Sequence, residues 1–259
     1  QYNIGLSTSF TGEDSLDRAI DSGSDGVYTK DNPMAFDTGA SLSVDGVTYS
    51  FPVGGASVVV GADTDVSTAF TGACTYSAFT DYMSNCGTGS SLGAGGKGVT
   101  AAASYAFDSG FSMAAGLSST SDSSAGILTK EGTDVYGLNA AYTADSYAVS
   151  LGYVVDDGAG EAETTYWGIN ASYTPESESF PSVSVGYETE EKSGTDKTGY
   201  FLGLTWSEVG PGSFSLGAGT AANYADNVTE YLVYEASYSY PVNDGLTITP
   251  GVFIEEKSG

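Results

Sequence analysis

The stretch YEASYSYPVNDGLTITPGVFIEE, residues 234–256, contains the pattern that decides the fold. From Leu232 to Tyr240 every second residue is an alanine or a larger apolar residue, and the residues between them are Val233, Glu235, Ser237 and Ser239. A period of two is that of a β-strand whose two faces differ. This alternation alone fits both a soluble β-sandwich and a strand with lipid on one side and water on the other.

The same alternation recurs along the chain, and the composition of the second face separates the two readings. Apolar rows occupy every second position in 111–117, 136–142, 147–155, 167–173, 183–187, 200–206 and 214–218. The opposite face carries mostly Gly, Ser, Ala, Thr and Asn, whereas a soluble sandwich exposes long charged side chains. Small polar residues around a water-filled interior, with Tyr and Trp at the ends of the apolar face, are typical of an outer-membrane barrel. A Gly/Ser-rich secreted sandwich or solenoid remains the alternative.

The connections give an independent test, because barrel strands are joined alternately by short turns and longer loops. From residue 107 onward, short links at 108–110, 144–146, 175–180, 207–212 and 242–245 alternate with longer polar links at 119–132, 156–163, 189–197 and 221–229. Asp45-Gly46 resembles a hairpin turn. A turn there would break the alternation, so 40–51 is predicted as one strand.

The predicted fold is an all-β transmembrane antiparallel β-barrel, with residues 1–259 forming one domain. Fourteen strands are visible, at 2–10, 15–21, 40–51, 56–64, 98–107, 111–118, 133–143, 147–155, 164–174, 182–188, 198–206, 213–220, 230–240 and 246–255. Sixteen are expected in the full protein, because both ends look unfinished and general porins commonly have that number. Pro250 lacks a ladder donor and therefore needs a bulge or an unpaired position.

Composition excludes several classes of function. The chain has 33 acidic residues, 7 Lys plus Arg, no His and a net charge of -26. Such a charge excludes general affinity for nucleic acid and favours cations as partners. No run of about 18 apolar residues is present, so a transmembrane helix is excluded. Without His or a metal-ligand cluster, no catalytic site stands out, and we expect neither an enzyme nor a bound cofactor.

The long link at 65–97 is the candidate pore constriction, because a long loop inside a compact domain is usually functional. Cys74 and Cys86 suit a disulfide that would pin it, worth about 3 kcal/mol; two free thiols are the alternative. The residues expected nearest the narrowest point are Asp63, Asp65 and Asp81, with Tyr76, Phe79 and Tyr82 giving it shape. Asp17, Asp21 and Glu235 are predicted acidic groups of the lumen. The alternative for this link is an external flap.

Two further features concern charge. Asp156, Asp157, Glu161 and Glu163 lie in one acidic link and form a candidate weak Ca²⁺ site, since Ca²⁺ takes several oxygen ligands. They match no EF-hand spacing, and a solvated acidic loop is the alternative.

Arg18 shares parity with Leu16 and Ile20 on the predicted lipid face, where an Arg at mid-membrane costs about 2–4 kcal/mol.

The chain resembles the major outer-membrane porins of cyanobacteria, a branch of the carbohydrate-selective porin superfamily often described as iron-uptake porins. The resemblance rests on LSTSFTGED at 6–14, TYSFPVGG at 48–55 and YEASYSYPVNDGLTITPGVFI at 234–254. It implies a trimeric barrel in the outer membrane, attached to peptidoglycan only through an N-terminal domain that these residues do not include. Relatives carry Arg in the strand after the first turn, where this chain has Asp17, Ala19 and Asp21.

These observations predict a porin that lets small hydrophilic solutes and ions diffuse through the outer membrane of a Gram-negative-type bacterium, with a preference for cations. The expected partners are the lipid bilayer, two further copies of the chain and the transported solutes. A secreted or cell-surface structural β-protein, such as a sheath or adhesin subunit, is the alternative function. A gated transporter is a third, but such barrels are larger and carry a plug.

Overall fold

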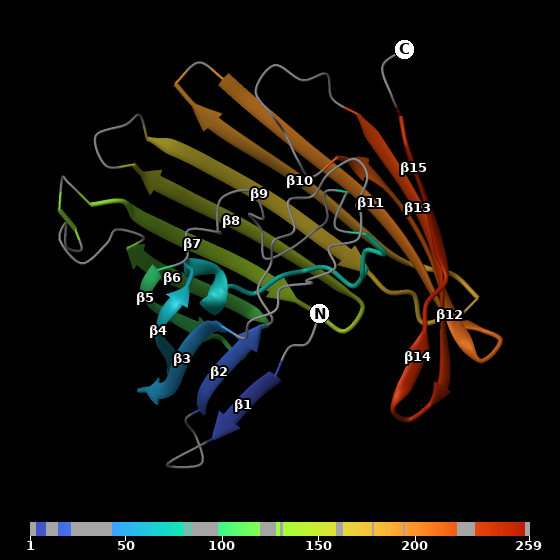
Figure 1. The fold of residues 1–259 in the computed structure, drawn as a ribbon, viewed down its shortest axis with the longest axis horizontal. Helices are drawn as coiled ribbons and strands as arrows, with labels where there is room; N and C mark the ends of the chain where they lie inside the picture. The colour runs from blue at the N-terminus through green and yellow to red at the C-terminus, as the bar shows by residue number, and fades with distance from the viewer. Residues whose placement is uncertain are drawn as a thin grey trace.

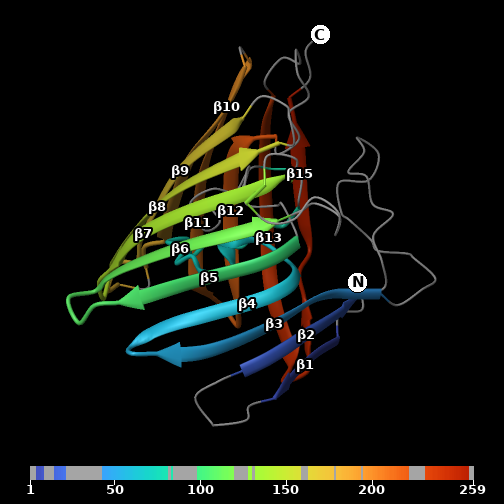
Figure 2. The same cartoon turned by 90° about the vertical axis from the view of Figure 1, so that its left-hand side faces the viewer.

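The computed structural model describes residues 4–8, 15–21, 43–80, 83, 98–119, 128–129, 132–158, 163–177, 179–193, 195–221 and 231–256, and for residues 4–8, 15–21, 43–45 and 195–196 only the backbone. The strands belong to one fifteen-stranded sheet. Figures 1 and 2 show that this sheet curls strongly, so that it has a concave and a convex face. Among the described residues, no helix is long and apolar enough to cross a membrane.

The strands follow the chain in order. They are β1 Ile4–Thr8, β2 Ser15–Asp21, β3 Ser43–Val53, β4 Ala56–Thr64, β5 Gly98–Ala106, β6 Phe111–Ser119, β7 Asp134–Thr143, β8 Tyr147–Asp157, β9 Thr164–Tyr173, β10 Ser182–Lys192, β11 Thr195–Val209, β12 Gly212–Thr220, β13 Leu232–Asn243, β14 Leu246–Ile248 and β15 Gly251–Glu255. One short 3-10 helix, η1 Val66–Ala69, follows β4. Each strand from β1 to β13 pairs antiparallel with the next. Within the described residues the pairing does not return from the last strands to β1.

Strands β14 and β15 are two parts of one predicted strand. Both pair with β13, and the register continues across the break, with Tyr240 opposite Ile248 and Ser237 opposite Gly251. The break falls at Pro250, which has no N–H to donate, although its carbonyl accepts from the Tyr238 backbone N–H at 2.9 Å. The fourteen predicted strands are therefore confirmed, and so is the all-β antiparallel fold. The predicted long link at 189–197 is wrong, because β10 continues to Lys192, β11 begins at Thr195, and these two residues lie opposite each other.

The rejected hairpin at Asp45-Gly46 is a bulge inside β3. The pairing with β2 shifts there, from Arg18 opposite Val47 to Ile20 opposite Val44. Gly46 has a φ of +122°, which favours glycine. The tight turn lies further on at Gly54-Gly55, whose φ values of +57° and +90° fit a two-residue turn with positive φ at both positions.

The two faces of the sheet differ as the alternation predicts. On β7, Leu138 is 56% exposed on the convex outer face, and its neighbour Asn139 is 4% exposed on the concave face. Aromatic pairs lie on the outer face toward opposite ends of the strands: the ring centroids of Phe111 and Tyr142 are 4.7 Å apart, and those of Tyr153 and Trp167 are 4.4 Å apart. The concave face, called the inner wall below, is where most of the fully buried polar side chains lie.

Candidate functional site

Residues 65–80, called the inner segment below, leave β4 and cross the inner wall (Figure 1, teal). Asp65 starts the segment by capping η1: its carboxylate accepts from the backbone N–H of Ser67 at 2.8 Å and from the Ser67 hydroxyl at 2.6 Å. Asp63 precedes it with a φ of +57°, where the β4–β5 register shifts. Asp65 is therefore occupied as a helix cap, and Asp63 is an exposed residue at the point where the chain leaves the wall.

The first part of the segment is held by an apolar cluster. Val66 and Phe70 pack with Ala102, Ala114, Val135 and Val154 from strands β5 to β8. Two glycines of the wall make this approach feasible. A Cβ at Gly116 would lie 3.3 Å from Val66, and one at Gly137 would lie 2.7 Å from the Phe70 ring. Glycine on the inner wall is thus required where the segment rests on it.

Neutral side chains of the wall bind the backbone of the next residues. The Asn139 carbonyl oxygen accepts from the Thr71 N–H at 2.9 Å, and the Ser150 hydroxyl donates to the Thr71 carbonyl at 2.6 Å. The Asn170 carbonyl oxygen accepts from the Ala73 N–H at 3.1 Å. The Ser184 hydroxyl oxygen then accepts from the backbone N–H groups of residues 75 and 76, at 3.0 and 3.1 Å. The polar residues of the inner wall therefore satisfy the segment's buried backbone groups.

Glu235 of β13 binds the last part of the segment. Its carboxylate accepts from the Tyr76 hydroxyl at 2.7 Å, the Phe79 N–H at 2.6 Å, the Thr80 N–H at 3.1 Å and the Thr80 hydroxyl at 2.9 Å. Burial raises the pKa of the Tyr76 hydroxyl, and the hydrogen bond to the Glu235 carboxylate and its charge raise it further. Tyr76 therefore stays protonated and donates. Glu235 is only 4% exposed, because the segment covers it.

A second apolar cluster lies beside this carboxylate. The Tyr76 ring lies 5.1 Å from Phe201, and both pack with Met83 and Val233. Met83 also forms a β-bridge with Ala221, at the end of β12. Glycines again make room: a Cβ at Gly203 would lie 2.5 Å from the Tyr76 ring, one at Gly217 would clash with the Tyr76 hydroxyl, and one at Gly251 would lie 2.6 Å from the Phe79 ring.

A cavity of about 440 Å³ lies between the inner segment and strands β11 to β13, with Thr249 just after β14. Its lining is almost entirely hydroxyl-bearing, with one aromatic ring: Thr75, Ser77, Ala78, Phe79, Thr205, Ser213, Ser215, Ser237, Ser239 and Thr249. None of these side chains is charged. The Phe79 ring thus lines the cavity and also lies against Gly251 of the inner wall.

Charged residues of the inner wall gather nearer the long loops. By the alternation of β10, Glu188 and Glu190 share the inner side with Ser184. Glu190 accepts from the Lys197 ammonium at 3.1 Å. Asp156 lies on the same side at the end of β8. Sequence reasoning did not select Glu188 and Glu190 as lumen residues, although their parity with Ser184 was the signal that could have found them.

The remaining predicted residues are placed as follows. Asp81, Tyr82, Cys86 and Glu161 lie outside the described residues, and so does the part of the long link at 84–97. Asp17 and Asp21 lie in β2, where Asp17 is opposite Thr48 of β3 and Asp21 is opposite Ser43. The side chains of both aspartates are not described. The side chain of Arg18 is likewise not described.

Three of the four candidate Ca²⁺ residues lie in the described part of the chain. Asp156 and Asp157 close that strand, and Glu163 precedes β9 as an exposed residue. Asp157 lies opposite Asp134 of β7. In the described part of the chain, no group of three or more His, Cys, Asp or Glu is arranged to hold a metal ion.

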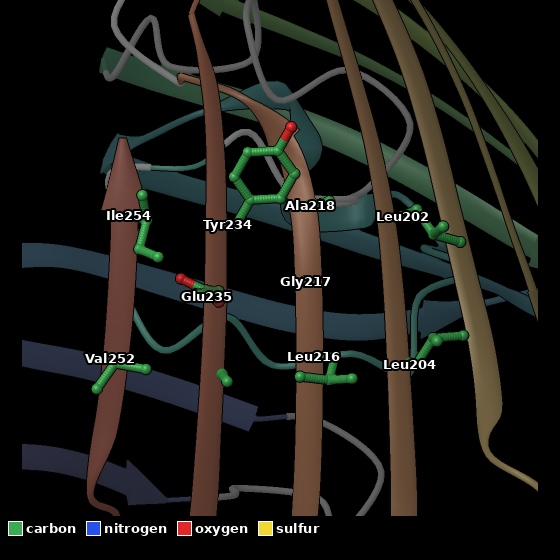
Figure 3. A pocket seen from close by; sticks show the side chains of 10 residues that line it. Leu202, Leu204, Leu216, Gly217, Ala218, Tyr234, Glu235, Val252 and Ile254 are labelled. Carbon is green, nitrogen blue, oxygen red and sulfur yellow. The ribbon is translucent and has the colours of Figure 1, made fainter. Parts of the chain in front are cut away.

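The outer face of the same strands is apolar. A groove of about 340 Å³ on this face is lined mainly by aliphatic side chains of β11, β12, β13 and β15. In Figure 3, Leu202, Leu204, Leu216, Val252 and Ile254 project from these strands, and the inner segment passes behind them. The wall that binds the segment on its inner side thus presents hydrocarbon on its outer side.

Comparison with solved structures shows the porin β-barrel fold. A mutant of the Rhodopseudomonas blastica porin superposes with a TM-score of 0.59 at 13% identity, over 97% of this chain and 83% of that one. A second porin structure gives a TM-score of 0.63 at 13% identity, over 98% and 86% of the two chains. OmpT, an outer-membrane protein of Vibrio cholerae in its trimer form, gives 0.62 at 14% identity, over 94% and 80%. No family model and no curated protein matches the sequence.

Proposed function

We propose that this protein is a porin of an outer membrane, a channel without enzymatic activity through which small hydrophilic solutes and ions diffuse. The observation that carries the proposal is the inner segment, bound across the concave side of a sheet whose convex side is apolar. A channel needs a lipid-facing exterior and a polar lined path. A segment inside the barrel would set the narrowest cross-section of that path.

A preference for cations is part of the proposal. The net charge is -26, and the inner wall carries Asp156, Glu188 and Glu190 near the long loops. A surplus of carboxylates raises the local concentration of cations and lowers that of anions. Asp63, Asp65 and Asp81 were the acids predicted nearest the constriction. Since the Asp65 carboxylate caps η1, Asp156 of β8 is the better candidate for a lumen charge that attracts cations.

The finer identity rests on the sequence motifs at 6–14, 48–55 and 234–254. They support a porin of the cyanobacterial type, forming trimers and passing nutrients that include iron and sugars. A bridge between Cys74 and Cys86 would stabilise the inner segment, and the absence of a free thiol at Cys74 supports it. Weak Ca²⁺ binding at the acidic link that contains Asp156, Asp157, Glu161 and Glu163 is proposed on its carboxylates alone.

The test is reconstitution into planar bilayers. The detergent-extracted protein, folded as judged by anomalous mobility in an unheated gel, is expected to give stepwise conductance. A reversal potential under a salt gradient is expected to show cation preference, and Asp156→Asn to reduce it, with Asp145→Asn in an exposed turn as the matched control. Extraction without detergent and no conductance from the folded protein would instead identify a structural surface protein. Anion preference would overturn the selectivity alone.

A further inference from the structure

We propose that Glu235 is the latch that holds residues 76–80 of the inner segment against the wall, and that releasing it undocks this part alone and changes the conductance. The inference deepens the proposed function and rests on it. Two features of the molecule carry it. One is the concentration of hydrogen bonds on a single carboxylate, and the other is the different chemistry that holds residues 65–75.

The carboxylate is the shared acceptor for this part of the segment. Four donors from residues 76, 79 and 80 converge on its two oxygens. Two of these donors are backbone N–H groups, which no substitution on the segment side can remove except by proline. Within the described residues its partners are hydrogen-bond donors, without a Lys or Arg in ion-pair contact. Changing this one side chain therefore removes the acceptor of several buried donors at once.

The first part of the segment does not depend on Glu235. Residues 66 and 70 are held in an apolar cluster, and residues 71, 73 and 75 by the amides and hydroxyls of Asn139, Ser150, Asn170 and Ser184. These anchors come from β7 to β10, whereas Glu235 comes from β13. Loss of the latch should therefore leave residues 65–75 in place. Residues 76–80 would keep the Tyr76 N–H bond to Ser184 and the packing of Tyr76 and Phe79.

The consequence for a channel follows from the cavity under this part. Thr75, Ser77, Ala78 and Phe79 form one side of the hydroxyl-lined cavity, and strands β11 to β13 with Thr249 form the other. When residues 76–80 leave the wall, the cavity opens and the free cross-section changes. The latch thus sets the width of the path on this side of the barrel.

The first experiment measures amide hydrogen exchange of the folded protein in detergent, for wild type and Glu235→Gln. The glutamine amide nitrogen would face N–H donors, so acceptors are lost while the volume is kept. Each hydrogen bond to a charged group can shift an equilibrium about ten-fold. We expect exchange at residues 76–80 to rise at least about ten-fold and exchange at 71–75 to stay unchanged. Equal rates at 76–80, or an equal rise at 71–75, would overturn the latch.

Graded variants guard against a folding defect. Glu235→Asp keeps the charge but shortens the reach, so part of the protection should return. Tyr76→Phe removes one of the four hydrogen bonds and should give a smaller rise than Glu235→Gln. The matched control is Glu190→Gln, an inner-wall acid of β10 that pairs with Lys197 of β11. It should leave exchange at 76–80 unchanged.

Single-channel recording completes the test and separates the two proposals. If wild type conducts and Glu235→Gln shows longer or more frequent alternative conductance levels, both hold. If wild type conducts and the variant is indistinguishable from it, the latch does not control the path. If wild type does not conduct while exchange responds as expected, the latch holds the segment but the proposed channel is wrong.

Discussion

Residues 65–75 and residues 76–80 of the inner segment rest on the same wall, but different chemistry holds them. Asn139, Ser150, Asn170 and Ser184 divide the first part among four neutral side chains, each making one to three bonds with the segment. The second part depends on one carboxylate, which takes four. Loss of one of the four neutral side chains removes only its own hydrogen bonds, whereas loss of the Glu235 carboxylate removes the acceptor of all four donors together. A single polar substitution therefore removes more hydrogen bonds to the segment in the second part than in the first.

The largest expected effect tests the apolar support of the first part. Phe70→Ala removes a buried ring from the cluster with Val135 and Val154, and such truncations cost about 3–5 kcal/mol. We expect opening of residues 66–72 and faster exchange there, with little change at 76–80. Leu138→Ala, on the exposed outer face of the same strand β7, is the control. Loss of protection at 76–80 to the same degree would show that the two parts open as one unit.

Alkaline pH tests the hydrogen bond between Tyr76 and Glu235 in the second part, because removing one proton changes no side-chain volume. The Tyr76 pKa is raised in the folded protein, mainly by burial and then by Glu235, so its stabilisation is present below about pH 10, the ordinary value for tyrosine, and is lost progressively above it. The bond is to a charged group and is worth about 1.5–3 kcal/mol. Exchange at 76–80 in wild type should rise more steeply above that pH than in Tyr76→Phe. Equal slopes in the two proteins, after correction for intrinsic exchange, would contradict this role.

Each part of the inner segment contacts a different glycine of the inner wall, so a side chain can be introduced under one part at a time. Gly137→Val would press on Phe70, and Gly203→Val on Tyr76. Overpacking costs about 1–3 kcal/mol. We expect each variant to increase exchange in its own part of the segment, while Ala140→Val on the outer face changes neither. A thermal midpoint and peptide-level exchange measure both. Unaltered exchange in Gly203→Val would mean that Tyr76 does not rest on that glycine in solution.

The smallest effect is expected from a single neutral anchor. Asn139→Ala removes the acceptor of the Thr71 N–H, together with the bonds that the Asn139 amide donates to the Ser150 hydroxyl and to the carbonyls of Thr71 and Leu151. A typical neutral hydrogen bond contributes about 0.5–1.5 kcal/mol. Ser150 still donates to the Thr71 carbonyl, so residues 71–75 should stay docked with a modest rise in exchange. An effect as large as that of Glu235→Gln would remove the distinction between distributed and shared anchors.

The strands could be predicted because each is specified by its own residues. The alternation around Tyr136 to Tyr142 and the short turn at 144–146 fix both the strand and the side on which Leu138 lies. The alternation of short and long links predicts Asp45-Gly46 inside a strand, where the structure has it in β3, whereas a local turn rule alone predicts a hairpin. Pro250 was recognised as a break in the ladder for the same local reason.

The candidate site was predicted only in outline. The sequence selected the long link at 65–97 and named Tyr76, Phe79 and Glu235, but it treated Asp65 as a pore acid and Glu235 as a lumen charge. In the structure Asp65 caps η1, and Glu235 is covered by the segment. Both roles depend on what lies beside the carboxylate in space, which a period-two pattern does not contain.

The sequence by itself determined the strands, their order along the sheet and which face carries hydrocarbon, because these follow from neighbours within a few residues and from the lengths of the turns. Only the tertiary structure decided why particular inner positions are Gly, Asn, Ser or Glu. Glu235 meets Thr80 across 155 residues of chain, and Asn139 meets Thr71 across 68. Such pairs form because the curled sheet brings distant inner faces to one segment whose buried backbone groups must be satisfied.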